Sequence, residues 1–519
     1  MNAMPRTARL LPLAAALAAA GIAQATPLSA PMPAAWKPGD GRGVAALFAA
    51  LTARSIARAP ISGHLAATLI VTSCADDGSG GTLRSVVSTA GEGDTVDASA
   101  LTCGAIALTG GAIPVYPDDL TLVGPGAKAL AVDGAGADRV FVHYGYGTLG
   151  LQDITLRNGS AVVAGYRVTG GACVISNGYV RLDHSTVSGC LAAGEGAYGG
   201  AITARGVRLY TSTLSGNTAL GSHPNAFTAA YGGGAMAYRG EVFLYASTVN
   251  GNSATHAATD THGSYCTGGG IFSDLGGYAY RSTLSGNYSF GTGGGLATHA
   301  GFGISDSTIA GNTARYKTGG GVFARVFDSM RINNSTIAGN TAGISGAGIY
   351  FMGVANSLAL QSSIVANDTV AGANADIATM GAFTVAGSNN LVTAGAGNVI
   401  LPGDTLRSDP RLWPLANNGG PTQTMGLLAG SPALGAGSNP NHYSNDQRGP
   451  GFPRTTGGLT DIGAFQGAVA PVPATPVPAL SGMLAALLAA FVGASAWRVL
   501  RRRMASGIFV NQRTKMEQG

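Results

Sequence analysis

A pair of short signals repeats seven times between Gly170 and Asn367, and this repeat limits the possible folds more than any other feature of the chain. Each unit has a glycine cluster followed by an apolar residue and then, 13 to 16 residues later, a Ser-Thr-apolar-x-x-Asn signal or a close variant. The clusters begin at Gly170, Gly199, Gly232, Gly268, Gly293, Gly319 and Gly346. The partner signals begin at Ser185, Ser212, Ser247, Ser282, Ser307, Ser335 and Ser362. The stretch leading to the next cluster varies more in length, which is typical of a solenoid with one rigid wall and one face of variable loops.

The residues inside the repeats favour strands over helices. Val, Ile, Thr and Ser form short runs bounded by Gly and Asn, and only 11% of the 519 residues are charged. The 82 glycines follow no three-residue period, which excludes collagen, and an apolar share of 45% is too high for simple disorder. A repeat of roughly 25 to 35 residues fits one coil of a solenoid. We therefore expect an all-β, right-handed parallel β-helix.

The asparagines that end the partner signals recur at one phase of the repeat. Because Gly and Asn tolerate positive φ, pairs such as Gly216 and Asn217 are expected to form a turn. Stacked coils would then align a ladder of side-chain amides from Asn217, Asn252, Asn287, Asn312, Asn340 and Asn367. The glycine clusters are expected to form the opposite bend. They lack the strand-to-helix context of phosphate loops, so we interpret them as structural.

At these residues the chain resembles a known family. The pairing of GG-apolar-apolar with apolar-x-x-Asn is similar to the repeats of polymorphic outer-membrane proteins, with Leu, Val or Ile where that family usually has Phe. One repeat has Cys190 in place of the Asn. Residues 74–97, 120–126 and 151–159 resemble the N-terminal cap and first coils of secreted bacterial β-helix proteins. The resemblance implies a secreted or surface-displayed, pectin-lyase-like solenoid.

The region after the repeats resembles the choice-of-anchor Q domain. The matching stretches are 409–412 (DPRL), 415–424 (LANNGGPTQT), 430–433 (GSPA), 446–449 (DQRG) and 461–465 (DIGAF). Gly435 and Gln466 stand where that family generally carries acidic residues. The family has no settled activity, so the resemblance implies architecture and surface location rather than a reaction.

Both ends of the chain carry signals for export. Arg6 and Arg9 precede an apolar run and a small-x-small cleavage site between Ala25 and Thr26. Near the other end, the apolar stretch 479–497 is followed by arginines and is long enough to cross a bilayer. It resembles a C-terminal sorting signal of the IPTL type through Val477, Pro478, Ala479, Leu480 and Ser481, followed by Arg501, Arg502 and Arg503. A retained membrane anchor and a signal cleaved by processing machinery both remain open.

These signals divide the chain into eight parts and place most of it outside the cytoplasm, at the cell surface, in the outer membrane or in the medium. We expect a signal peptide (1–25), an N-terminal extension (26–66), a cap with the first coils (67–160), the repeat β-helix (161–400), a choice-of-anchor Q-like domain (401–467), a Pro-rich linker (468–478), a transmembrane or sorting segment (479–503) with a hydrophobic helix, and a short tail (504–519). Without the two ends the body carries 22 basic and 24 acidic residues, and it has no basic stripe. Nucleic acid is therefore not an expected partner.

Five cysteines in an exported chain favour disulfides. Cys74 and Cys103 bracket the cap, and Cys173 and Cys190 lie on the two arms of the first complete repeat. Cys266 is left over, and its pairing stays open. A metal site that combines it with His256, Asp260 and His262 is the alternative to an ordinary polar loop. That spacing matches no established metal motif, so we expect neither metal nor cofactor.

A polysaccharide lyase or glycoside hydrolase of pectin-lyase-like fold is the alternative to a binding scaffold. Such hydrolysis needs two or three carboxylates converging on one cleft. The acids of the repeats fall at different phases: Asp183, Glu195, Glu241, Asp260, Asp274, Asp306 and Asp328. Asp183 and Asp306 come nearest to a shared phase, but four repeats place them on the order of 20 Å apart. His184 follows Asp183 directly, so the two side chains would point to opposite faces. We expect no catalytic residues.

Tyrosines concentrate in the central repeats. They are Tyr210, Tyr231, Tyr238, Tyr245, Tyr265, Tyr278, Tyr280, Tyr288 and Tyr316. Exposed on a wall of the solenoid, their amphipathic rings would stack on sugar rings, whereas packing at corners is the alternative. The sequence therefore predicts a non-catalytic structural, adhesive or glycan-binding protein, with a polysaccharide or a surface or matrix component as partner.

Overall fold

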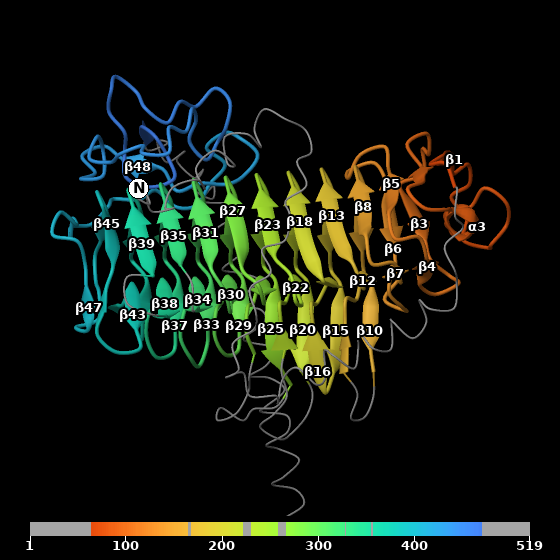
Figure 1. Ribbon diagram of the computed structural model, residues 1–519, viewed down its shortest axis with the longest axis horizontal. Helices are drawn as coiled ribbons and strands as arrows, with labels where there is room; N and C mark the ends of the chain where they lie inside the picture. The colour runs from red at the N-terminus through yellow and green to blue at the C-terminus, as the bar shows by residue number, and fades with distance from the viewer. Residues whose placement is uncertain are drawn as a thin grey trace, which may run out of the picture. The chain divides into compact units, whose positions relative to one another are not determined.

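The chain forms a right-handed parallel β-solenoid of about 11 turns in a computed structural model (Figure 1). The structure describes residues 64–163, 168–221, 230–257, 266–326, 329–353 and 357–469. Every strand pair of the coils is parallel except the pair that closes the last one, where β41 and β42 run antiparallel. The all-β solenoid that the repeat predicts is therefore confirmed.

Four long sheets form the walls of the solenoid. Sheet 1 contains β1 (Thr68–Ile70), β2 (Thr95–Asp97), β5 (Leu120–Val123), β8 (Thr148–Gln152), β13 (Tyr179–Asp183), β18 (Gly206–Tyr210), β23 (Val242–Tyr245), β27 (Gly277–Tyr280), β31 (Phe302–Ser305), β35 (Met330–Asn333), β39 (Leu358–Gln361) and β45 (Ala386–Ser388). Sheet 2 contains β4 (Ile113–Val115), β7 (Phe141–His143), β12 (Val174–Ser176), β17 (Ile202–Ala204), β22 (Ala235–Ala237), β26 (Ile271–Ser273), β30 (Leu296–Thr298), β34 (Val322–Arg325), β38 (Ile349–Met352) and β43 (Ile377–Thr379). Sheet 3 contains β3 (Ala105–Ala107), β6 (Ala131–Asp133), β9 (Thr155–Arg157), β14 (Thr186–Ser188), β19 (Thr213–Ser215), β24 (Thr248–Asn250), β28 (Thr283–Ser285), β32 (Thr308–Ala310), β36 (Thr336–Ala338), β40 (Ile364–Ala366) and β46 (Leu391–Val392). Sheet 4 contains β10 (Ser160–Val162), β15 (Leu191–Gly194), β20 (Thr218–Gly221), β25 (Ser253–His256), β29 (Tyr288–Ser289), β33 (Thr313–Ala314), β37 (Thr341–Ala342), β41 (Thr369–Val370) and β42 (Ala373–Asn374).

Smaller elements complete the chain. Helix α3 (Leu83–Thr89) packs at the N-terminal end, and Thr82 caps it by accepting a hydrogen bond from the backbone N–H of Ser85. A three-stranded sheet holds β11 (Val168–Gly170), β16 (Gly196–Tyr198) and β21 (Ala230–Tyr231). Two strand pairs lie near the C-terminal end: β44 (Phe383–Thr384) with β47 (Val399–Ile400), and β48 (Leu427–Leu428) with β49 (Ala468–Val469).

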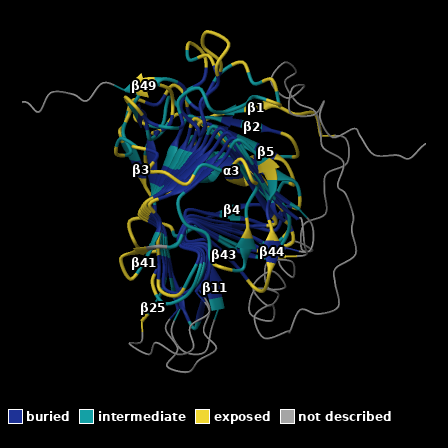
Figure 2. Cartoon of the chain, turned by 90° about the vertical axis from the view of Figure 1, so that its left-hand side faces the viewer, coloured by how far each residue is buried: buried dark blue, intermediate teal, exposed yellow. Residues whose placement is uncertain are grey.

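Alternation along each strand builds the core. In β18, Val207 and Leu209 are completely buried inside the coil, whereas Arg208 and Tyr210 point outward and are half-buried. Figure 2 shows the buried residues gathered on the stacked strands and the exposed ones at the turns. The glycine clusters form close backbone contacts, as expected. A Cβ on Gly233 would lie 2.2 Å from the carbonyl oxygen of Gly269 in the next coil.

The asparagine ladder is present but ends on a different residue. Asn217, Asn252, Asn287, Asn312 and Asn340 are buried, and each donates from its backbone N–H and its side-chain Nδ2 to the Oδ1 of the next rung. The rung after Asn340 is Asp368, so the prediction of Asn367 as a rung was wrong. Asn367 is exposed, with φ of +60°, and takes the corner position that Gly339 occupies one coil earlier.

The same one-residue shift applies to the last partner signal. Thr336 pairs with Ile364, so Ser335 aligns with Ser363 rather than with Ser362. The backbone N–H of Ser335 accordingly donates to the hydroxyl oxygen of Ser363. Ser362 occupies the left-handed corner, with φ of +50°, which belongs to Asn334 in the preceding coil. Serines therefore form a second ladder beside the asparagines.

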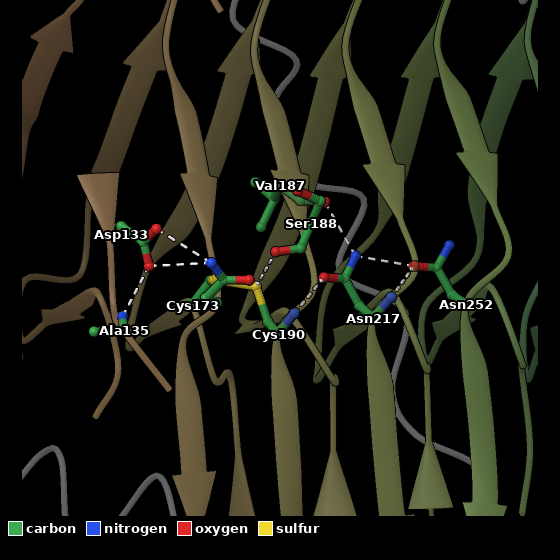
Figure 3. Close-up of a disulfide and its surroundings, with 9 residues drawn as sticks. Asp133, Ala135, Cys173, Val187, Ser188, Cys190, Asn217 and Asn252 are labelled. Atoms are coloured by element: carbon green, nitrogen blue, oxygen red, sulfur yellow. Dashed lines mark hydrogen bonds between the residues drawn. A yellow bond between two sulfur atoms is a disulfide. The ribbon is translucent and has the colours of Figure 1, made fainter. Parts of the chain in front are cut away.

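Both predicted cysteine pairs are present as disulfides. Cys74 is bonded to Cys103, and Cys173 to Cys190. Cys190 also keeps the place of the missing rung, because its backbone N–H donates to Asn217 Oδ1 at 3.0 Å (Figure 3). Cys266 is unpaired and buried.

The residues after the coils pack against them. In Figure 1 they are the blue loops next to the ends of β31, β35 and β39, and they belong to the same compact unit as the solenoid. The part predicted as a choice-of-anchor Q-like domain (401–467) is thus attached to the wall of the β-helix. The predicted signal peptide, nearly all of the N-terminal extension and Pro-rich linker, the sorting segment and the tail lie outside the described residues. Within the described ranges, no helix is both long and apolar enough to cross a membrane.

Candidate functional site

A row of tyrosines lies on the outer face of sheet 1. Tyr210, Tyr245 and Tyr280 are the last residues of β18, β23 and β27, and strand register places them directly beside one another. Their neighbouring ring centroids are 6.4 and 5.6 Å apart. Tyr245 is 38% exposed, and the other two are half-buried. Three successive coils thus present aromatic rings at regular spacing.

The C-terminal part of the chain supplies a fourth ring. Tyr443 lies 5.4 Å from Tyr280, centroid to centroid, and the residue beside Tyr280 in the next strand of sheet 1 is Ser305, which has no ring. Its hydroxyl is 3.3 Å from the hydroxyl of Tyr278. Burial raises the pKa of Tyr278 and of Tyr280 above the usual value for tyrosine, so both hydroxyls are protonated at neutral pH. We call Tyr210, Tyr245, Tyr280 and Tyr443 the tyrosine row.

Arginines and further rings flank the tyrosine row. The outward position two residues earlier holds Arg181, Arg208, Phe243 and Tyr278 in successive strands. The Arg181 guanidinium lies 4.9 Å from the centroid of the Tyr210 ring. The Arg208 guanidinium lies 4.8 Å from the Tyr179 ring. These contacts hold flat, hydrogen-bonding guanidinium groups beside the rings.

The remaining tyrosines of the predicted cluster lie elsewhere. Tyr231 is buried on another wall, where it stacks on Tyr198 with centroids 5.6 Å apart. Tyr238, Tyr288 and Tyr316 are half-buried away from the row, and Tyr265 lies outside the described residues. Of the nine tyrosines that the sequence analysis singles out, Tyr210, Tyr245 and Tyr280 belong to the row.

The acidic residues of the repeats are engaged separately. Asp183 accepts two hydrogen bonds from Arg181, at 2.7 and 3.1 Å, and Asp274 lies 3.5 Å from His299. Asp306 is completely buried beneath the C-terminal part of the chain. Asp260 and Asp328 lie outside the described residues. Asp183, Asp274 and Asp306 therefore each lie beside a different basic residue.

Cys266 and His256 are the two residues of the alternative metal site that lie within the described part of the chain. The His256 ring lies 6.1 Å from the Phe290 ring, and burial raises the pKa of the Cys266 thiol to about 12. Asp260 and His262 lie outside the described residues. Across the described ranges, no three His, Cys, Asp or Glu side chains come close enough together to hold a metal ion.

Motif residues of the C-terminal part attach it to the solenoid. The Gln447 side chain accepts from the Thr308 hydroxyl at 2.6 Å and donates to Thr283 Oγ1 at 2.9 Å. Within the C-terminal part itself, the fully buried Arg454 guanidinium donates to the carbonyls of Gly463 and Ala464. This attachment positions Tyr443 at the end of the tyrosine row.

Arg454 also lies close to Asp306, with Nη2 and Oδ1 2.9 Å apart and both side chains fully buried. The alignment is poor, because no hydrogen bond reaches either oxygen of Asp306. Burial raises the pKa of Asp306 to about 7, although Arg454 and Arg281 lower it.

No family model, curated protein or solved structure matches this chain.

Proposed function

We propose that this protein is an exported, surface-associated scaffold that binds an extended polysaccharide along the tyrosine row and does not cleave it. The observation that carries the proposal is the row itself, in which four rings follow one another at 5.4 to 6.4 Å. Sugar rings stack through their apolar faces on aromatic rings, and tyrosine adds a hydroxyl at the rim.

Rigidity favours binding by such a surface. The register of sheet 1 sets Tyr210, Tyr245 and Tyr280 side by side and their rings contact one another, so little side-chain freedom is lost when a ligand binds. The guanidinium group of Arg181 lies next to the Tyr210 ring and supplies hydrogen-bond donors for sugar hydroxyl groups.

The absence of catalysis is supported by the state of the acids beside the tyrosine row. Asp306, which interacts with Tyr280, is completely buried. Asp183 precedes Tyr210 in the same row, but both of its oxygens already accept from Arg181. A general base needs an open approach to its substrate, and a carboxylate whose two oxygens are held by an arginine lacks one.

Export is supported by the signals at the two ends and by two disulfides, which persist in oxidising compartments. The C-terminal apolar segment would then tether the solenoid to a membrane or be removed by processing machinery. A surface location would bring the tyrosine row into contact with polysaccharides of the envelope or matrix.

A glycan array with the purified protein tests the proposal, followed by titration of any bound glycan. Tyr245→Ala is expected to weaken binding roughly 2- to 12-fold, because one aromatic stacking contact contributes about 0.5–1.5 kcal/mol. Tyr350→Ala is the matched control, since this half-buried tyrosine stacks on Phe323 on sheet 2. Equal losses in both variants would contradict the assignment of the binding face.

A further inference from the structure

The asparagine ladder ends in two neighbouring buried carboxyl groups. Asn340 donates from its backbone N–H and from Nδ2 to Asp368 Oδ1, at 2.7 and 2.8 Å. Asp368 in turn donates its own backbone N–H to Asp376 Oδ1 at 3.1 Å. Asp368 and Asp376 therefore occupy the two rung positions after Asn340, in the last coil of the solenoid.

A rung needs a donor that an ionised carboxylate lacks. Every asparagine rung uses Nδ2 twice, for the Oδ1 of the next rung and for a backbone carbonyl of the preceding coil, as Asn340 does with Asp368 Oδ1 and the Ile309 carbonyl. By the same register, Asp368 Oδ2 stands where Nδ2 would face Asp376 Oδ1 and the Ile337 carbonyl. Asp368 Oδ2 is enclosed and has no hydrogen-bond partner. If Asp368 were ionised, its Oδ2, which can then only accept hydrogen bonds, would face two other acceptors, Asp376 Oδ1 and the Ile337 carbonyl. Such a buried arrangement is unfavourable.

We propose that Asp368 is a neutral carboxylic acid at neutral pH, with its proton on Oδ2 and donated to Asp376 Oδ1. One proton taken from solvent then replaces the amide hydrogen of a rung and links the last two rungs. The solenoid is closed by a proton-dependent lock.

The surroundings assign the proton to Asp368 and the charge to Asp376. Asp376 Oδ2 accepts from the Thr393 hydroxyl at 2.5 Å and from the Ala394 N–H at 2.6 Å, while its Oδ1 accepts from the Asp368 N–H. Asp368 receives hydrogen bonds only from Asn340. The groups that act on the two carboxyls are one another, Asn340, Thr393 and Ala394, and no cation is among them. Burial, and then the neighbouring Asp376, raise the pKa of Asp368 well above its usual range.

The sign of the pH dependence follows from this raised pKa. The unfolded chain releases the proton of Asp368 near the ordinary aspartate pKa of about 3.9, whereas the folded chain keeps it to higher pH. The stabilisation is complete below about pH 4 and is lost as the pH rises through the folded-state pKa. Alkaline pH should therefore loosen the coil that contains β40, β41, β43 and β46.

Hydrogen exchange of the full chain between pH 5 and pH 9 tests the lock, with β13 and β18 of the same molecule as the internal reference. Relative to that reference, exchange in the last coil should rise by up to about tenfold per pH unit until the pH reaches the folded-state pKa of Asp368, and level off above it. D368N places an amide Nδ2 where the hydroxyl stood, so its last coil should lose this pH dependence. D153N is the control, because Asp153 is a half-buried acid in a distant coil and this change should leave the pH dependence intact.

The proposal is overturned if exchange in the wild-type last coil does not change with pH, or if D368N retains the wild-type pH dependence. Should D368N not fold, infrared spectroscopy of the wild-type chain decides. A protonated buried carboxyl at pH 7 supports the lock, and the lack of one refutes it.

Discussion

Removing one rung from the middle of the asparagine ladder should destabilise the solenoid far more than an average surface substitution. In Asn312→Ala, the Asn287 backbone N–H and one Nδ2 hydrogen of Asn287 lose the acceptor that they reach at 2.9 Å. The Leu284 carbonyl and Asn340 Oδ1 each lose a donor. A stranded buried donor costs about 1–3 kcal/mol and each further lost bond about 1 kcal/mol. Because the surrounding residues relax in part, we expect the free energy of unfolding to fall by about 3–5 kcal/mol in Asn312→Ala.

Urea unfolding followed by circular dichroism measures this loss, with midpoints compared because a repeat solenoid need not unfold in one step. The matched control is Asn367→Gly. It replaces the exposed asparagine that the repeat pattern places in the ladder, at a φ of +60° that glycine adopts freely. This control should stay within about 0.5 kcal/mol of the wild type. If both variants shift the midpoint equally, the assignment of the ladder is refuted.

Two further changes test the packing between the parts of the chain. Arg454→Met leaves Asp306 buried without its cation, so stability should fall by about 3 kcal/mol. Because the pKa of Asp306 is raised, the loss should be larger at pH 8 than at pH 5, and equal losses in urea titrations at the two pH values would contradict this explanation. Replacing Cys173 by Ala and Cys190 by Asn removes a disulfide but restores an amide rung. This pair should melt above a variant with Ala at both positions, by the equivalent of about 1 kcal/mol, and coincident melting curves would show that an amide at position 190 adds nothing to the ladder.

Much of the fold could be predicted, because the residues that favour turns, Gly and Asn, recur at fixed positions from repeat to repeat. The phases of glycine and asparagine identified the two bends and the ladder as far as Asn340. The positions of the cysteines around the cap and on the first repeat identified both disulfides. The last repeat was misaligned by one residue, because Ser362-Ser363 offers two possible starts and Asn367-Asp368 two possible ends. The structure places Asn367 at the exposed left-handed corner and gives the buried position to Asp368. Because the repeat pattern has Asn at the ladder positions, it did not identify Asp368 as the residue that follows Asn340 in the ladder.

The candidate site was less predictable, because one of its four rings comes from a segment far away in the sequence. Tyr210, Tyr245 and Tyr280 share a strand phase, so their row follows from the register of the repeats. Tyr443 comes from outside the repeats and reaches the row only because Gln447 and Arg454 anchor its segment to the coils. No periodicity in the sequence connects position 443 with Tyr280.

The most direct test of the proposed function is a glycan-binding measurement combined with turnover assays on the same preparation. Reducing-end and unsaturated-uronate assays are run with each glycan that the protein binds. Our proposal predicts a bound polysaccharide that stays intact and whose affinity falls in Tyr245→Ala but not in Tyr350→Ala. Release of reducing ends or unsaturated uronates would contradict a non-catalytic scaffold.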